Sequence, residues 1–233
     1  SKTKVIMPVY NLGFPGEIEK IVDIADDKNL KILEDCCEAH GGERKGIKLG
    51  AYGDLSALSF FVAHNITTGE GGMVFSSDEE IDNQLRELRE FGRLFETEKR
   101  YYSDNVLSDY DVRYVSKSSG YNVRMTDVAA SMGRVQLSKL DSLNNTRRQV
   151  VNKIVALIDQ KEWLSTILVR EGDKSAHYGV PILIDKEAPF SRKEICTYLE
   201  AKGIETRALM MGCLPDQPAF RDLKHKISGD LKF

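Results

Sequence analysis

Residues able to take part in catalysis gather in four short stretches of this 233-residue chain. The stretches are EDCCEAHG (34–41), LSFFVAHNITTGEGG (58–72), SGYNVRMTD (119–127) and ETRALMMG (205–212). His64 carries an imidazole, which can accept and return protons near neutral pH. Asp35 offers a carboxylate at the end of one apolar run, and Ser59 offers a hydroxyl within another. The sequence therefore predicts proton-transfer chemistry around His64, provided that the fold brings the stretches together.

The spacing of apolar residues predicts that strands alternate with helices in the first part of the chain. Strands are expected at 4–9, 30–33, 55–62 and 73–76, and helices at 17–28 and 79–91. Such alternation is typical of an α/β fold with a mostly parallel sheet and helices on both faces. Since ligands bind at the carboxyl ends of parallel strands, Asp35 and the loop that carries His64 should lie close together.

The rest of the chain predicts a long loop, a long helix and a smaller α+β domain. The loop is expected over 93–119, and the helix over 126–157. A strand at 178–184, a helix at 191–202 and a loop at 209–220 follow. Ser191 and Glu194 have capping-box spacing at the start of that helix. We expect the chain to divide into residues 1–145 and 146–233.

Composition and charge exclude several classes of protein. The chain is 41% hydrophobic and 30% charged, which is ordinary for a folded protein. Its net charge is −3, so it has no excess of the basic residues that nucleic-acid binders carry. No run is long enough to cross a bilayer, and no signal peptide is visible. The four cysteines show no zinc-binding CxxC spacing, so we expect a reduced cytoplasmic protein without a metal site.

The four stretches, in this order and at this spacing, resemble the DegT/DnrJ/EryC1/StrS family of sugar aminotransferases and dehydratases. The most specific part is Ser59-Phe60, then a catalytic position at residue 64, then a Thr-Gly-Glu-Gly-Gly turn. The resemblance implies a fold-type I vitamin B6 enzyme. Residues 1–145 would be part of the large cofactor-binding domain and residues 146–233 part of the small C-terminal domain. Family members carry further segments on either side, so we expect a chain truncated at both ends.

The resemblance implies pyridoxal or pyridoxamine 5′-phosphate as cofactor and assigns residues to it. Asp35 matches the aspartate that keeps the pyridine nitrogen protonated, so that the ring accepts electrons. Ser59 matches a phosphate-binding serine. Glu38 stands where many relatives have glutamine beside the cofactor's 3-oxygen, a departure that bears on the protonation of that oxygen. Taken alone, Asp35 would be a solvated residue at a strand end, and Ser59 a serine bonded to the backbone.

Two further residues match the family outside the cofactor-binding stretches. Asn122 matches the residue that reaches the cofactor phosphate of the neighbouring subunit, which implies a homodimer with shared active sites. Arg207 resembles a substrate contact in related dehydratases. Without the resemblance, Asn122 would be a turn residue and Arg207 a solvated side chain.

Position 64 distinguishes the reactions of the family. Aminotransferases have a lysine there, which forms an imine with the cofactor, and this chain has no lysine between Lys48 and Lys99. Histidine transfers protons but cannot form that imine. Histidine at this position marks the sugar 3-dehydratases. The resemblance therefore implies a pyridoxamine-phosphate-dependent lyase that removes the C3 hydroxyl of a nucleotide-linked 4-keto-6-deoxyhexose. Such enzymes serve dideoxysugar and lipopolysaccharide O-antigen biosynthesis, and glutamate is the expected amine donor.

Two alternatives stay open beside the dehydratase. One is a nucleotide-sugar aminotransferase, which the missing lysine disfavours. The other is a non-catalytic sugar-nucleotide-binding pseudoenzyme, which Asp35 disfavours, because a binding protein has no use for a protonated pyridine. Some related dehydratases carry an iron–sulfur cluster and depend on a reductase. With no cysteine between Cys37 and Cys196, we expect no cluster here. GDP and CDP both remain candidates for the nucleotide.

Overall fold

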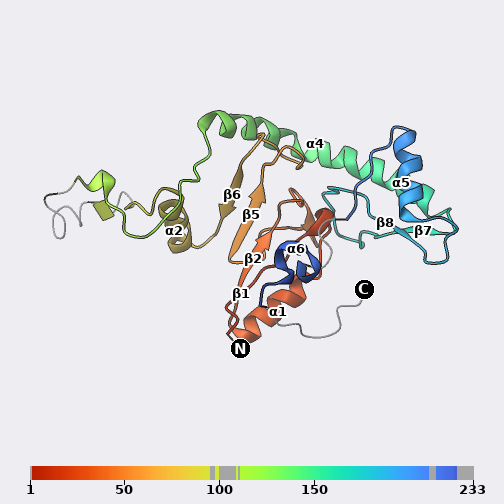
Figure 1. The fold of residues 1–233 in the computed structure, drawn as a ribbon. Helices are drawn as coiled ribbons and strands as arrows, with labels where there is room; N and C mark the ends of the chain where they lie inside the picture. Colours follow the sequence, from red (N-terminus) through yellow and green to blue (C-terminus); the bar gives the residue numbers. More distant parts are fainter. Residues whose placement is uncertain (1, 95–97, 100–108, 110, 210–213, 225–233) are drawn as a thin grey trace.

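A four-stranded sheet in the order β1-β2-β5-β6 forms the centre of the structure (Figure 1). This computed structural model describes residues 2–94, 98–99, 109, 111–209 and 214–224. β1 (Val5–Ile6), β2 (Lys31–Asp35) and β5 (Leu55–Ser59) are parallel neighbours. β6 (Gly72–Phe75) pairs antiparallel with β5, because the short segment between them is a turn and not a crossover. The predicted α/β fold with a mostly parallel sheet is confirmed.

The main helices form where the sequence predicts them. They are α1 (Ile18–Lys28), α2 (Glu79–Arg89), α4 (Asp127–Ile158) and α5 (Arg192–Ala201). Asp78 and Thr126 cap α2 and α4 with their side chains, and Ser191 and Glu194 form the expected capping box of α5. α4 continues through residue 145, so the proposed domain boundary lies inside a helix. That division of the chain stays a prediction.

Several short elements lie where the sequence carries no clear periodic pattern. They are a hairpin of β3 (Glu43–Arg44) and β4 (Ile47–Lys48), the strand β7 (Leu164–Thr166), the helix α6 (Pro218–Arg221) and three 3₁₀ turns, η1 (Asn11–Gly13), η2 (Val112–Tyr114) and η3 (Leu214–Asp216). η3 and most of α6 fall within the loop predicted over 209–220, of which residues 210–213 lie outside the described part. β8 (Ile182–Ile184) pairs antiparallel with β7 and is shorter than the predicted strand 178–184. Of the long loop predicted over 93–119, residues 95–97, 100–108 and 110 lie outside the described part.

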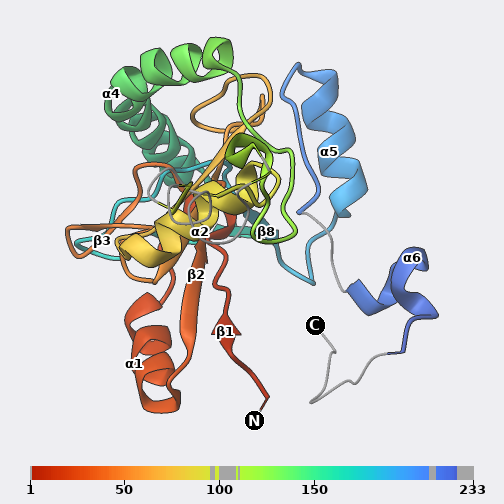
Figure 2. The same ribbon diagram turned by 90° about the vertical axis from the view of Figure 1, so that its left-hand side faces the viewer.

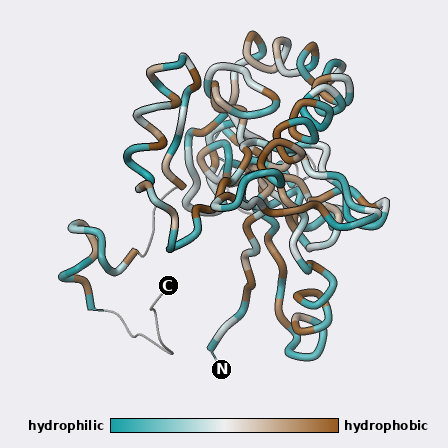
Figure 3. Tube along the Cα trace, turned by 90° about the vertical axis from the view of Figure 1, so that its right-hand side faces the viewer, coloured by the Kyte–Doolittle hydropathy of each residue, from teal (hydrophilic) through white to brown (hydrophobic). Residues whose placement is uncertain are grey.

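Two apolar clusters support the carboxyl end of the sheet. The first joins Ile18 of α1 to Tyr10, Cys36, Ala39 and Leu49, and the second joins Phe60 and Ile66 to Leu140 of α4. Figures 1 and 2 show α4 crossing the end of the sheet at which β2 and β5 finish. In Figure 3 the apolar segments gather in the middle of the structure, around the sheet. Within the described residues, no helix has the length and apolarity that a bilayer span requires.

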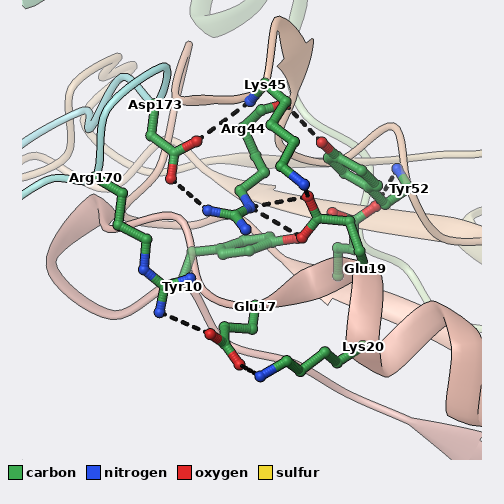
Figure 4. A network of polar contacts seen from close by, with 10 residues as sticks. Tyr10, Glu17, Glu19, Lys20, Arg44, Lys45, Tyr52, Arg170 and Asp173 are labelled. Carbon is green, nitrogen blue, oxygen red and sulfur yellow. Dashed lines mark hydrogen bonds and ion pairs between the residues drawn. The ribbon is translucent and has the colours of Figure 1, made fainter.

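Charged side chains fasten a later segment of the chain to α1 and to the β3–β4 hairpin (Figure 4). Arg44 places Nε 2.9 Å from an oxygen of Glu19 and Nη1 2.7 Å from Oδ2 of Asp173. The Asp173 side chain is only 2% exposed. Arg170 adds an ion pair with Glu17 at 3.0 Å. The chain just after Asp173 is therefore held beside the sheet, where it contributes to the site.

Candidate active site

Asp35 and Ser59 end two neighbouring parallel strands at the same edge of the sheet. Asp35 pairs with Ala57 of β5, two residues before Ser59, and the Cys36 amide donates to the Ala57 carbonyl at 2.9 Å. Cys37 lies between the two, because its amide donates to Asp35 Oδ1 at 3.0 Å and its thiol contacts the Ser59 backbone. Burial, with the Asp35 carboxylate adding to it, raises the pKa of the Cys37 thiol to about 12. The thiol is therefore protonated beside Asp35 at neutral pH.

Glu38 lies at the same edge of the sheet, in the turn after β2. Its side chain is buried, and Oε2 accepts a 2.5 Å hydrogen bond from the Leu12 amide. Leu12 and Gly13 both have positive φ, and a Cβ on Gly13 would lie 2.7 Å from the Glu38 carbonyl oxygen. Only glycine allows that approach without displacing the backbone. The turn after β1 is thus packed directly on the turn that carries Glu38.

His64 lies in the turn that follows β5. Ser59 Oγ accepts from the Phe61 amide at 3.3 Å, and the Phe61 carbonyl accepts from the His64 amide at 3.0 Å, so one turn joins Ser59 to His64. The imidazole contacts His40, with ring centroids 6.2 Å apart, and Tyr178, with ring centroids 5.5 Å apart. His64 Nδ1 is buried and has no hydrogen-bond partner among the described residues.

The Gly-rich turn that follows His64 is hydrogen-bonded to the residue just after β5. The Thr68 amide donates to the Phe60 carbonyl at 3.0 Å, and the Phe60 amide donates to the Gly71 carbonyl at 2.9 Å. A Cβ on Gly71 would lie 2.5 Å from Thr68 Oγ1 and 2.9 Å from Met125 Sδ. This close approach explains why glycine stands at position 71, and it packs the stretch 119–127 against the loop of His64.

Two buried asparagines fix the loop of His64 to the rest of the site. Asn65 Nδ2 donates to Asn144 Oδ1 at 3.1 Å and to the Ala176 carbonyl at 2.9 Å. Asn144, in the middle of α4, donates to the His40 carbonyl at 2.8 Å. Sequence reasoning missed both residues. The available signal was the position of Asn144, a polar residue that shares the buried side of α4 with Leu140 and Val151.

Arg207 approaches His64 through Tyr178. Arg207 is exposed, and its Nη1 donates to the Tyr178 hydroxyl at 3.1 Å. Tyr178 was not identified from the sequence, because a lone tyrosine in a short apolar run carries no motif. The structure thus connects two predicted site residues, His64 and Arg207, through a third that was not predicted.

Asn122 forms no hydrogen bond with another predicted site residue among those that the structure describes. It is exposed, forms an isolated bridge with Glu90, and accepts a hydrogen bond from Arg124 at 3.3 Å through its side chain. Within the described part of the chain it makes no contact with Asp35 or His64. Its assignment to a neighbouring subunit's site stays a prediction.

The chain resembles known proteins along its whole length. The model of the DegT/DnrJ/EryC1/StrS aminotransferase family matches residues 1–233. A dTDP-4-dehydro-2,6-dideoxy-D-glucose 3-dehydratase of Saccharopolyspora spinosa is 31% identical over 240 residues, which cover 99% of this chain and 52% of the relative. A GDP-perosamine synthase of Escherichia coli O157:H7 is 32% identical over 235 residues, which cover 99% of this chain and 58% of the relative.

A solved structure has the same fold. It is the E. coli GDP-4-keto-6-deoxy-D-mannose-3-dehydratase with bound hydrated PLP, with a TM-score of 0.79 and 27% sequence identity. The match covers 91% of this chain and 55% of that one. This chain therefore spans a little over half the length of each of these three proteins.

Proposed function

Because this chain belongs to the DegT/DnrJ/EryC1/StrS aminotransferase family, we propose that it removes the C3 hydroxyl from a nucleotide-linked 4-keto-6-deoxyhexose as a pyridoxamine-phosphate-dependent dehydratase. The family match confirms the resemblance carried by the four sequence motifs, and the likeness to solved structures confirms the predicted fold. The relatives include dehydratases and a perosamine synthase at similar identity. The choice of dehydration therefore rests on one observation, which is histidine in place of lysine at position 64.

The residues at the carboxyl edge of the sheet fit a phosphorylated pyridine cofactor. Asp35 would accept a hydrogen bond from the protonated ring nitrogen, Ser59 would bind the phosphate, and Glu38 would lie beside the 3-oxygen. All three are at one edge, and the unpartnered Nδ1 of His64 lies in the adjoining turn. When bound, pyridoxamine phosphate supplies an amine that bonds to C4 of the sugar and a ring that takes up electrons.

His64 would move protons in both halves of the reaction. Its imidazole takes a proton from the amine-bearing carbon of the cofactor, and Nε2 is the acceptor because Nδ1 is buried. The same nitrogen then returns a proton to the C3 hydroxyl as that group leaves as water. In this turn no lysine is present to deliver a proton to sugar C4, which is the step that would complete an amino transfer. Elimination is then favoured.

The remaining predicted partners belong to the same proposal. Glutamate would restore the amine form of the cofactor after each turnover. Asn122 would bind the cofactor phosphate of a second subunit, because its side chain is exposed and is bonded to Arg124 and not to the described residues of its own site. Arg207, exposed near the site, would contact the sugar nucleotide through its planar group of N–H donors.

Mass spectrometry of the sugar tests the proposal directly. The cofactor-loaded enzyme is incubated with pyridoxal phosphate, glutamate and GDP- or CDP-linked 4-keto-6-deoxyhexose, and the product is compared with that of a His64→Asn variant. The aminated product hydrolyses and releases its nitrogen as ammonia. We therefore expect a sugar that has lost one oxygen and retains no nitrogen, formed by the parent enzyme alone. An amino sugar would identify an aminotransferase instead. No absorbance band with pyridoxamine phosphate would identify a non-catalytic binding protein.

A further inference from the structure

Tyr178 lies between two predicted site residues, His64 and Arg207, that are far apart in the sequence. Its ring meets the ring of His64 at an interplanar angle of 62°, with centroids 5.5 Å apart. Its hydroxyl accepts a hydrogen bond from Arg207 Nη1 at 3.1 Å. His64 follows β5, Tyr178 precedes β8, and Arg207 follows α5, so the three come from separate parts of the chain.

We propose that Tyr178 is a positioning residue for His64 and that Arg207, through the Tyr178 hydroxyl, holds it in place. The proposal rests on the proposed function of His64 as the base. Edge-to-face packing fixes the tilt of an imidazole without using its nitrogens. His64 needs such a contact, because its buried Nδ1 forms no hydrogen bond among the described residues that could orient the ring.

The backbone on both sides of Tyr178 is anchored, so the position of its ring is well defined. The Tyr178 amide donates to the Leu12 carbonyl at 3.0 Å, and Arg147 Nη1 donates to the His177 carbonyl at 3.2 Å. The hydroxyl end of the ring, by contrast, depends on Arg207 alone among the described residues. Removing that hydrogen bond frees the end of Tyr178 that faces away from its backbone.

Arg207 can serve Tyr178 and a ligand together. One of its nitrogens donates to Tyr178, and its other N–H groups form no hydrogen bond among the described residues. A guanidinium has five donors in a planar arrangement, so an anionic or hydroxyl group of the substrate could bind beside Tyr178. Substrate bound at Arg207 would then hold Tyr178 in place against His64. The imidazole of His64 would therefore be correctly oriented when substrate is present.

A double-mutant cycle separates this role from simple substrate binding. The variants are Tyr178→Phe, Arg207→Gln and the pair together, assayed as the holoenzyme by consumption of the keto sugar. Tyr178→Phe should lower kcat about 10-fold, and Arg207→Gln should add little to it in the double variant, because both remove one hydrogen bond. Strictly additive effects on kcat would overturn the proposal, since Arg207 would then act on substrate alone.

Removing the ring tests the contact with His64 itself. Tyr178→Leu should lower kcat about 100-fold with a smaller change in KM, whereas Tyr178→Phe keeps the ring packing and so loses only the roughly 10-fold expected for the missing hydroxyl. Two titratable side chains, His40 and Tyr178, contact the His64 ring. Because Tyr178→Leu removes one of them, the pH profile of kcat should also change. Tyr198→Phe, on exposed α5, is the matched control and should match the parent.

A magnetic-resonance measurement makes the inference independent of the reaction type. In cofactor-free protein with labelled histidine, the His64 ring signal is assigned by its loss in His64→Asn. We expect a single sharp signal in the parent and in Tyr178→Phe, and a shifted, broadened one in Tyr178→Leu. An unchanged signal in Tyr178→Leu would overturn the positioning role, whichever product the enzyme forms. Formation of an amino sugar would instead refute the proposed dehydration and leave this result standing.

Discussion

His40 and His64 meet edge to face, with ring centroids 6.2 Å apart and an interplanar angle of 74°. Both ring nitrogens of His40 are buried and lack hydrogen-bond partners among the described residues. Burial, and to a smaller extent the neighbouring His64, lowers the pKa of His40 to about 4. Burial, with Arg148 and Arg147 adding to it, lowers the pKa of His177 to about 4 as well. Both side chains are therefore neutral in the folded protein at pH 7.

These shifts predict that the fold weakens in mild acid. In the unfolded chain both histidines bind a proton near their ordinary pKa of 6.5, and in the folded chain only near pH 4. Their contribution to stability is fully present above about pH 6.5 and is lost as the pH falls towards 4. The loss amounts to at most about 3 kcal/mol for each histidine. Urea unfolding followed between pH 7.5 and 4 measures it.

A substitution at one histidine identifies its share of this pH dependence. His40→Asn lowers the stability at every pH, because the packing changes, but its free energy of unfolding should depend less steeply on pH between 6.5 and 4. A slope equal to that of the parent would show that His40 protonates as readily in the folded chain as in the unfolded one.

Sequence rules succeeded wherever a residue acts on its own neighbourhood. Asp78 and Ser191 cap helices through hydrogen bonds to residues two or three positions later, so their role is visible in the sequence. Asp35 and the loop of His64 could be placed at one edge because parallel neighbouring strands end there. Tyr178 and Asn144 could not be found this way, because their partners lie far along the chain and no local pattern encodes such contacts.

Glu34 also contacts residues that are distant in the sequence, and replacing it should lower the stability of the fold. Its fully buried carboxylate accepts from the Tyr10 hydroxyl at 2.6 Å and from the amides of Gly50, Tyr52 and Gly53 at 2.6–2.8 Å. Glu34→Gln would place an amide NH₂ against donors, so the free energy of unfolding should fall by about 2 kcal/mol. Chemical denaturation measures the change.

An exposed glutamate provides the control for that substitution. Glu205 is exposed and makes no hydrogen bond or ion pair among the described residues. Glu205→Gln should therefore stay within about 0.5 kcal/mol of the parent. Equal effects of the two substitutions would contradict the view that Glu34 holds the loop over residues 50–53.

The ion pair between Arg44 and Asp173 also contributes to stability. Breaking it should lower the free energy of unfolding, and replacing both partners should restore part of the loss. Asp173→Asn leaves the nearly buried Arg44 with Glu19 as its remaining carboxylate, so the free energy of unfolding should fall by about 2 kcal/mol. Replacing both partners, as Arg44→Met with Asp173→Leu, should recover part of that loss. Urea titration of the three proteins, with exposed Glu171→Gln as control, measures it. A double variant less stable than Asp173→Asn would exclude the pair as the cause.

Mixing of inactive subunits tests whether Asn122 serves a second chain. His64→Asn and Asn122→Ala variants are prepared separately and then allowed to exchange subunits. If Asn122 acts on the neighbouring site, heterodimers contain one intact site, and an equal mixture should regain about a quarter of the parent activity. Size-exclusion chromatography checks that dimers form. No recovery, despite exchange, would place Asn122 in the site of its own chain.

Replacement of His64 by lysine tests whether this one side chain sets the reaction type. A lysine amine in the same turn, after Ser59, can form an imine with the cofactor and can return a proton to sugar C4, which an imidazole that only exchanges protons cannot do. His64→Lys should therefore form amino sugar from the keto sugar and glutamate, and it should eliminate the C3 hydroxyl more slowly. Product masses measure the ratio of the two products, and His64→Asn, which should form neither, is the control. If His64→Lys still eliminates cleanly and forms no amino sugar, other residues of the site decide between elimination and amino transfer, and His64 contributes only the proton transfer that both reactions share.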